Sequence, residues 1–234
     1  MNLPIILHIE TSTNVCSVAL SEGENCIFSI SNDEGLNHAA LLSTFIEKAL
    51  SEAKVQSKKL DAVAVSGGPG SYTGLRIGVS TAKGLCYGFG IPLIAVSTLE
   101  VLSIPAIKKA DSDKDALFCP MIDARRMEVY AAMYNAELKI KKEISADIIN
   151  SESYADILSQ QKVYFFGNGA EKCKATLTHP YALFIDEITP LAENMIPLAL
   201  NSFRANSFAD LAYYEPFYLK EFQATTPKQL KVES

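Results

Sequence analysis

The stretch from Ser66 to Gly90 has the residue types of an anion-binding turn, and it holds eight of the chain's twelve glycines. A short apolar run before it is typical of a buried strand, and Gly67-Gly68-Pro69-Gly70 then predicts a turn before a helix that ends near Gly88. A strand, a glycine turn and a helix N-terminus direct unpaired N–H groups at one point. The segment is neither a Walker loop nor a GxGxxG motif, so the identity of a ligand stays open.

Side chains that could act as acids, nucleophiles or metal ligands are scattered along the chain. Glu10 and Asp123 each end a predicted strand, where most carboxylates are solvated or cap the following turn. The three histidines, His8, His38 and His179, lie far apart, and only His38 is placed where a partner would reach it. The five cysteines lack a CxxC pair, which favours buried free thiols, and no GxSxG sequence is present. We therefore predict no catalytic residue and no metal site.

The elements that must position these residues follow the order βββαβαβ in the first half of the chain. Three strand-like runs separated by tight turns predict an antiparallel meander, and a helix, a strand, the glycine-rich helix and another strand complete the order. The bounds of the predicted elements outside the glycine-rich helix are Ile5–Glu10, Val15–Ser21, Asn25–Ser31, Asn37–Ala53, Ala62–Ser66 and Ile91–Val96. This order is typical of the ribonuclease-H/actin-like α/β architecture.

The second half repeats this order more weakly, so we predict two related βββαβα domains, residues 1–103 and 104–234, joined by a polar linker at Ser103–Lys114. A helical stretch is expected from Leu191 to about Asn206, followed by an aromatic tail and a frayed end at Thr225–Ser234. The other predicted elements of the second half are the strands Leu117–Asp123, Glu128–Asn135, Lys139–Ile149 and Val163–Phe166, the helix Tyr154–Gln160 and the turn Gly167-Asn168-Gly169.

The helix Asn37–Ala53 and the glycine-rich helix together predict an interaction surface. The apolar positions of the first helix cover a wide arc, and Gly74, Gly78 and Ala82 recur every four residues as a flat ridge. The ridge has two interpretations: close packing onto the chain's own sheet, or a seat for a helix of another subunit. On the second, we expect a homodimer when the chain is alone and the same surface for a partner. The predicted contact residues are His38, Leu41, Leu42, Phe45, Ile46, Thr73, Gly74, Ile77, Gly78 and Thr81.

The sequence GGPGSYTGLRIGVSTAKGL, together with ILHIETS at residues 6–12, resembles the bacterial TsaB family, formerly called YeaZ. The likeness is specific over about residues 5 to 105 and diffuse beyond them. It implies an actin-like (ASKHA) two-domain fold and a non-catalytic scaffold or activator that binds a TsaD-like enzyme. With a TsaE-like ATPase, these proteins form N6-threonylcarbamoyladenosine in tRNAs that read ANN codons. In this family a Pro-x-Tyr-Leu segment, here Pro216–Leu219, fastens the C-terminus to the body of the protein.

The resemblance also has implications for single residues. Paired halves of actin-like proteins close on a nucleotide, which implies a weak nucleotide site at Glu10, Thr11, Ser12 and Asp123. TsaD-like enzymes carry a His-x-Glu-Gly-His metal site where this chain reads Thr98-Leu99-Glu100-Val101-Leu102, without either histidine. We therefore expect no metal and no cofactor bound by the chain alone, with ATP or ADP at the interface of the complex. A weak nucleotide phosphotransferase or ATPase is the alternative, and a metallopeptidase would lack its histidines.

Composition limits the partners. The 234 residues are 48% hydrophobic and 21% charged, as in an ordinary globular protein. No apolar run approaches the ~20 residues that span a bilayer. The N-terminus MNLPIILHIE lacks the features of a signal peptide, so we expect a cytoplasmic protein without membrane contact. A net charge of −6 argues against independent affinity for tRNA, because phosphate contacts need clustered lysine and arginine, and we expect tRNA only through the complex.

Overall fold

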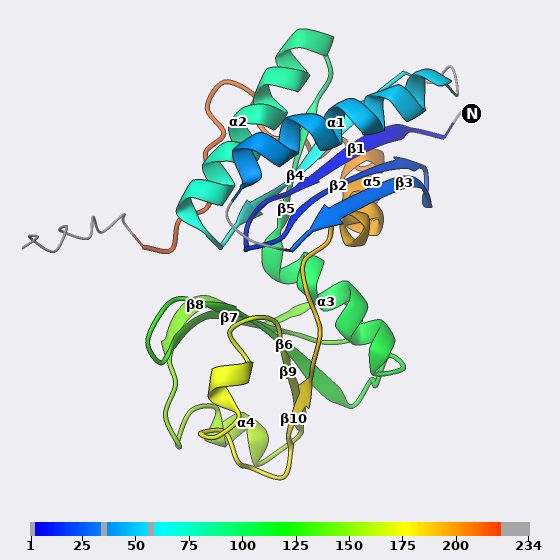
Figure 1. The fold of residues 1–234 in the computed structure, drawn as a ribbon. Coiled ribbons are helices and arrows are strands. Elements are labelled where there is room, and N and C mark those ends of the chain that lie inside the picture. The colour runs from blue at the N-terminus through cyan, green and yellow to red at the C-terminus, as the bar shows by residue number, and fades with distance from the viewer. Residues whose placement is uncertain (1–2, 34–36, 56–58, 221–234) are drawn as a thin grey trace, which may run out of the picture.

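The computed structural model describes residues 3–33, 37–55 and 59–220. These residues form two five-stranded sheets, one in each half of the chain, and the two halves are stacked in Figure 1. Within the described ranges, no helix has the length and apolar character that crossing a membrane requires. The arrangement is that of two α/β domains.

The N-terminal sheet has the strand order β3-β2-β1-β4-β5. Its strands are β1 (Ile5–Glu10), β2 (Cys16–Glu22), β3 (Asn25–Asn32), β4 (Ala62–Gly68) and β5 (Leu93–Ser97). β1 pairs antiparallel with β2 and parallel with β4, so the predicted meander is confirmed and the later strands extend it on the other side. β1 and β4 are buried along their whole length, which explains their nearly continuous apolar sequences.

Three helices cover the two faces of this sheet (Figure 1). They are α1 (His38–Val55), α2 (Tyr72–Phe89) and α5 (Ile196–Arg204). Leu7 and Ile9 of β1 belong to the core beneath α1 and α2, whereas Ile6 belongs to the core beneath α5. Ser71 is the N-cap of α2, and its side chain accepts the N–H of Gly74 at 3.3 Å. The sheet thus has an apolar core on each side.

The C-terminal sheet repeats this topology, with the order β10-β9-β6-β7-β8. Its strands are β6 (Ala116–Asp123), β7 (Glu128–Tyr134), β8 (Ile140–Ile148), β9 (Lys162–Phe166) and β10 (Ala182–Ile185). β6 takes the place of β1, because it pairs antiparallel with β7 and parallel with β9. The chain therefore has the predicted actin-like (ASKHA, ribonuclease-H-like) α/β fold with two related halves.

The helices of the second half are shorter than predicted. The expected helix at residues 154–160 is a single turn, α4 (Ala155–Leu158). The turn at residues 167–169 leads into a 3₁₀ turn (Glu171–Cys173) instead of a helix. β10, which the sequence did not predict, has four half-buried residues at the edge of the sheet. Elements this short leave too weak a periodic pattern to be recognised.

The predicted linker, residues 103–114, is wrong in its first half. This part belongs to α3 (Thr98–Lys109). Leu99, Leu102 and Ala106 recur at helical spacing and pack into an apolar cluster of the second half of the chain. Ser103 is buried, and only Lys108 and Lys109 at the end of α3 are exposed; their composition, continued by the polar residues after the helix, suggested a linker.

The C-terminal segment returns to the first half of the chain, although the sequence assigned residues 104–234 to one domain. Met195 and Ala199 pack against the N-terminal sheet. Ala209 then forms a bridge with Leu93 of β5. The C-terminal segment thus covers an apolar face of the N-terminal sheet that the first half of the chain leaves open. The residue composition near the predicted domain boundary does not reveal this contact. The end predicted to be frayed, residues 225–234, lies outside the described residues.

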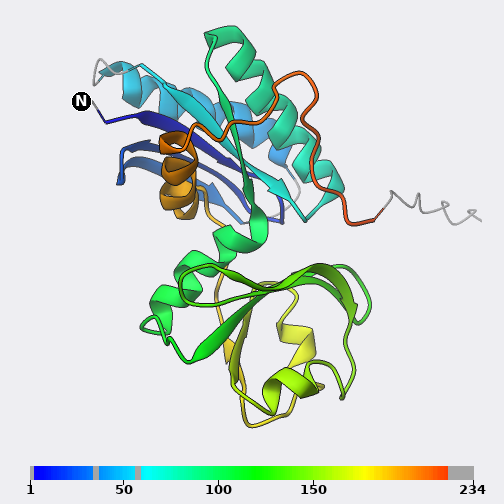
Figure 2. The same cartoon turned by 180° about the vertical axis from the view of Figure 1, so that it is seen from behind.

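Residues 209–220, here called the C-terminal strap, run along α2 (Figure 2). The ammonium group of Lys83 donates to the carbonyl oxygens of Ala212 and Tyr214 at 3.2 and 3.0 Å. The N–H of Phe217 donates to the carbonyl oxygen of Gly67 at 2.7 Å. The aromatic tail therefore fastens the end of the described chain to the glycine turn, as expected.

Candidate functional site

A cleft of about 640 Å³ opens between the two halves of the chain. Its N-terminal wall is formed by the turn after β1 and the start of α2. Its C-terminal wall is formed by the turn between β6 and β7, together with Asn168 after β9, and residues 217–220 of the C-terminal strap contribute to its rim. Equivalent turns of the two related halves thus face one another across the cleft.

Glu10 ends β1 but does not line the cleft. Its side chain is fully buried, and its Oε1 accepts the N–H of Ser12 at 2.6 Å. Burial raises the pKa of this carboxyl to about 7, and hydrogen bonds from Ser12 and Ser66 oppose the rise. Ser66 also shares a hydrogen bond of 2.7 Å with Thr98. Glu10 therefore stabilises the turn after β1 from the interior of the protein, not from the cleft.

Thr11 and Ser12 are buried under the start of α2. The Thr11 hydroxyl donates to the carbonyl oxygen of Gly74 at 2.8 Å, and the Ser12 carbonyl accepts the N–H of Ser71 at 2.7 Å. Methyl groups at Gly74 and Gly78 would collide with the carbonyl and hydroxyl oxygens of Thr11. The glycine ridge therefore packs on the chain's own sheet, which is the first of its two interpretations.

Asp123 lines the cleft, and 49% of its side chain is exposed. It accepts the N–H of Arg125 at 3.0 Å and is paired with the ammonium group of Lys172, which also donates to the Glu128 carbonyl oxygen at 2.7 Å. The Glu128 carboxylate is paired with Lys220 of the C-terminal strap. Both carboxylates of this wall thus have cationic partners within the chain. Sequence reasoning missed these pairs because the partners are distant along the chain.

The second candidate site is the surface of α1 and α2, and part of the predicted contact set is buried there. Leu42, Phe45 and Ile46 are exposed by only 1%, 6% and 5% and belong to the core beneath the helices. His38 is also buried, and its Nε2–H donates to the carbonyl oxygen of Thr13 at 2.7 Å. These side chains support the fold of the isolated chain and leave little surface for a partner.

A groove of about 400 Å³ lies between α1 and α2, and of the accessible predicted residues only Thr81 lines it, whereas Thr73 lines the inter-domain cleft. Leu41, Ile77 and Thr81 are half-buried, and Thr73 is exposed. The groove is lined by Ser43, Ile46, Glu47, Leu50, Ser51, Thr81 and Leu85. Sequence reasoning left Leu85 out, although its position one helical turn after Thr81 could have found it. The exposed surface is therefore narrower than the predicted arc.

The other side chains considered for chemistry are mostly structural. His8 is buried with its Nε2 at 2.8 Å from the Ser21 hydroxyl, and burial lowers its pKa to about 3. Thr98 and Leu102 are buried, and in the described part of the chain no three His, Cys, Asp or Glu residues are grouped to hold a metal. Four of the cysteines are buried as predicted, but the prediction is wrong for Cys26, which is exposed on the edge strand β3.

Two related sheets with a cleft between them define a two-domain protein of the actin-like class. A family model described as "TsaD: tRNA N6-adenosine threonylcarbamoyltransferase" matches residues 33–228. The "tRNA threonylcarbamoyladenosine biosynthesis protein TsaB" of Buchnera aphidicola from Schizaphis graminum is 32% identical over 174 residues, which cover 73% of this chain and 81% of that protein. The chain belongs to the TsaB family, also called YeaZ.

Two further comparisons delimit the likeness. TsaB of Buchnera aphidicola from Acyrthosiphon pisum is 37% identical over 130 residues, covering 56% of this chain and 57% of that protein, so this match spans little more than half of the relative. The structure of YeaZ from Pseudomonas aeruginosa is similar to this chain with a TM-score of 0.80 and 26% identity, over 93% of this chain and 100% of that chain. The likeness in structure therefore extends over both halves.

Proposed function

We propose that this chain is a non-catalytic subunit in the formation of tRNA threonylcarbamoyladenosine. It binds and activates a TsaD-like enzyme, acts together with a TsaE-like ATPase, and is needed for N6-threonylcarbamoyladenosine in tRNAs that read ANN codons. The names of its TsaB relatives and the match to the TsaD family model support the process. The observation that carries the non-catalytic role is the burial of Thr98 and Leu102.

Thr98 and Leu102 stand near the start of α3, where the family resemblance places the metal-binding histidines of TsaD-like enzymes. Thr98 is fully buried and hydrogen-bonded to Ser66, and Leu102 packs in the cluster that contains Phe118 and Ile122. A leucine side chain cannot ligate a metal, and both side chains are buried against neighbouring elements. This packing supports a structural role.

The groove between α1 and α2 supports docking of the enzyme subunit. Leu50 and Leu85 give it an apolar lining, and Ser43 and Glu47 lie among the same lining residues. Helices commonly bind by placing apolar side chains in such a groove. A related subunit presents the same pair of helices, so this face forms both the homodimer of the chain alone and the complex with the enzyme. ATP or ADP then binds at the interface of the complex, and tRNA is held mainly by the enzyme.

Thr81→Arg tests this docking surface, because it places a charged side chain in the groove. Ser80→Arg is the matched control, since it adds the same charge at an exposed neighbouring position. We expect Thr81→Arg to be a folded monomer that no longer binds the TsaD-like enzyme, measured by light scattering and by thermal melting. Ser80→Arg should assemble like the wild type. Normal assembly of both variants would exclude the groove as the docking surface.

A weak actin-like nucleotide phosphotransferase or ATPase is the second candidate function. The inter-domain cleft, at about 640 Å³, has the size of a small-molecule site. Against this function, Asp123 is already paired with Lys172, and Glu10 is buried behind the cleft. Titration with ATP and Mg²⁺, with and without the TsaD-like enzyme, separates the two functions. Tight binding and turnover by the chain alone would favour the alternative.

A further inference from the structure

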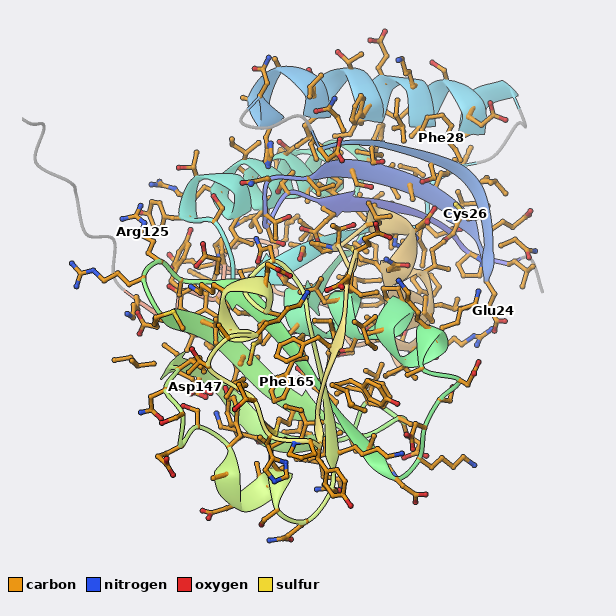
Figure 3. All side chains as sticks on the ribbon, turned by 60° about the horizontal axis from the view of Figure 1, so that its bottom comes forward. Glu24, Cys26, Phe28, Arg125, Asp147 and Phe165 are labelled. Atoms are coloured by element: carbon orange, nitrogen blue, oxygen red, sulfur yellow. The ribbon has the colours of Figure 1, made fainter. Side chains whose placement is uncertain are left out.

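The turn between β6 and β7 carries two consecutive arginines at the mouth of the inter-domain cleft. Arg125 and Arg126 both line the cleft, and both are exposed. Figure 3 shows Arg125 at the outer edge of the molecule. Over the ranges that the structure covers, the ion pairs include neither arginine. Two guanidinium groups are therefore available to a ligand at this place.

The backbone of this turn is unfavourable for arginine. φ is 71° at Arg125 and 48° at Arg126, in the left-handed region that glycine and asparagine adopt with least strain. The N–H of Ala124 donates to the carbonyl oxygen of Glu128 at 3.1 Å, and the Glu128 N–H donates to the carbonyl oxygen of Arg125 at 3.1 Å. These two bonds close a loop of three residues, 125–127, at the end of the β6–β7 hairpin. Two arginines in left-handed conformations, where asparagine and glycine would be less strained, point to a functional use of their charge.

The other charges on this wall leave the mouth of the cleft cationic. Its two acidic side chains, Asp123 and Glu128, are each paired with a lysine, Lys172 and Lys220 respectively. Among the residues that the structure describes, no acidic side chain of this wall remains to neutralise the two arginines. Because the whole chain has a net charge of −6, the mouth of the cleft is a local exception that favours an anionic ligand.

Aromatic side chains lie on the opposite side of the mouth. Tyr72 of α2 and Tyr218 of the C-terminal strap both line the cleft, with their ring centroids 4.8 Å apart. The guanidinium carbon of Arg76 lies 5.4 Å from the centroid of Tyr72. Arginine and aromatic side chains along one groove are typical of surfaces that bind single-stranded nucleic acid. Phosphates pair with the guanidinium groups there, and unstacked bases pack on the rings.

The bottom of the cleft is a poor site for a mononucleotide. Its mouth is better suited to a strand of nucleic acid. The C-terminal strap covers the glycine turn, because the N–H of Phe217 is bonded to the Gly67 carbonyl and its own carbonyl oxygen lies against Gly68. The N–H of Ser71 is bonded to the Ser12 carbonyl. The unpaired cationic groups are therefore on the rim, where a polyanion that crosses the mouth meets them.

We propose that the Arg125–Arg126 turn binds the phosphodiester backbone of an RNA strand that crosses the mouth of the inter-domain cleft, with Tyr72 and Tyr218 on the facing side. The proposal rests on the proposed function, since the RNA is the tRNA held by the assembled complex. The turn adds phosphate contacts to those of the enzyme subunit. This explains how an acidic chain takes part in RNA binding without holding RNA alone.

The double substitution Arg125→Asn with Arg126→Gly tests the proposal, because it removes both charges and suits the backbone of the turn. Arg125→Lys with Arg126→Lys keeps the charge. Arg204→Gln with Lys108→Gln is the matched control for lost charge: Arg204 is paired with Glu24, which lies at the opposite end of the molecule from Arg125 in Figure 3. Fluorescence anisotropy measures binding of labelled tRNA by the complex with the TsaD-like enzyme over a range of salt concentrations.

We expect the Asn-Gly variant to weaken tRNA binding by about tenfold and to lower the slope of log Kd against log salt by about 1 to 2. Its melting temperature should equal or exceed that of the wild type, and the lysine variant and the distant control should bind normally. Unchanged affinity and slope in an intact complex would overturn the proposal, and so would lost ATP binding with unchanged tRNA binding. Failure of the wild-type chain to join the enzyme would instead overturn the proposed function, and this proposal with it.

Discussion

Glu10→Gln tests whether the end of β1 is buried behind the turn. The substitution keeps the shape of the side chain and an oxygen that accepts the Ser12 N–H, but it removes the ionisable group. Burial raises the pKa of Glu10 from 4.5 to about 7. At about 1.4 kcal/mol for each pH unit, this difference corresponds to about 3 kcal/mol in the free energy of unfolding.

The direction of the pH effect follows from the higher pKa in the folded chain. The contribution of Glu10 to stability is fully present below about pH 4.5 and is lost as the pH rises through about 7. His8 acts in the opposite direction: burial lowers its pKa from 6.5 to about 3, so its contribution is present above pH 6.5 and is lost as the pH falls. Because both proteins contain His8, the difference between wild type and Glu10→Gln isolates Glu10.

Urea unfolding of both proteins from about pH 4 to about pH 8 gives this difference. We expect the wild type to lose about 3 kcal/mol relative to Glu10→Gln as the pH rises to about 7, with little change above it. Glu47→Gln, at an exposed position of α1, is the control for a lost carboxyl. A difference that stays constant over the whole range would mean that Glu10 titrates like an exposed carboxyl, and its burial would be refuted.

Four further substitutions test the packing around the two candidate sites. Gly74→Ala should lower the free energy of unfolding by roughly 1–3 kcal/mol, because the methyl group meets the Thr11 carbonyl oxygen, whereas Gly84→Ala, with open space around it, should raise it by about 0.5–1 kcal/mol. Phe45→Ala should cost about 3–5 kcal/mol in urea unfolding, and a folded Phe45→Ala protein of wild-type stability would contradict its place in the core. Lys83→Met should speed proteolysis within residues 209–220, and equal cleavage rates would show that its two hydrogen bonds do not hold the C-terminal strap.

The repeated order of strands and helices made most of the fold predictable. Strand bounds agree with the structure to within one or two residues in the first half, because β1 and β4 are continuous apolar runs between turn residues. The second half of α3 was missed because its terminal lysines, Lys108 and Lys109, and the polar residues that follow them look like a linker. The return of α5 to the first sheet depends on contacts between distant parts of the chain, and no local pattern encodes it.

The candidate sites were less predictable than the fold. Sequence spacing marked the apolar arc of α1, but it could not show that Leu42 and Phe45 face the chain's own core. An arginine at either position would bury an unpaired charge and unfold the chain. From the sequence, the glycine ridge could pack either on the chain's own sheet or on a helix of another subunit. The contacts with Thr11 decide for the chain's own sheet. The pairing of Asp123 with Lys172 joins the end of β6 to the 3₁₀ turn after β9, and the spacing of residues in the sequence does not reveal such a contact.

Reconstitution of the tRNA modification tests the central claim most directly. The reaction contains tRNA, threonine, bicarbonate, ATP, the enzyme that forms threonylcarbamoyl-adenylate, the TsaD-like enzyme and the TsaE-like ATPase, with or without this chain. Modified adenosine is measured by mass spectrometry of the digested tRNA. We expect threonylcarbamoyladenosine only when this chain is present, and no product when it replaces the TsaD-like enzyme. An unchanged yield without this chain, or product formed by this chain in place of the TsaD-like enzyme, would contradict its role as a required non-catalytic subunit.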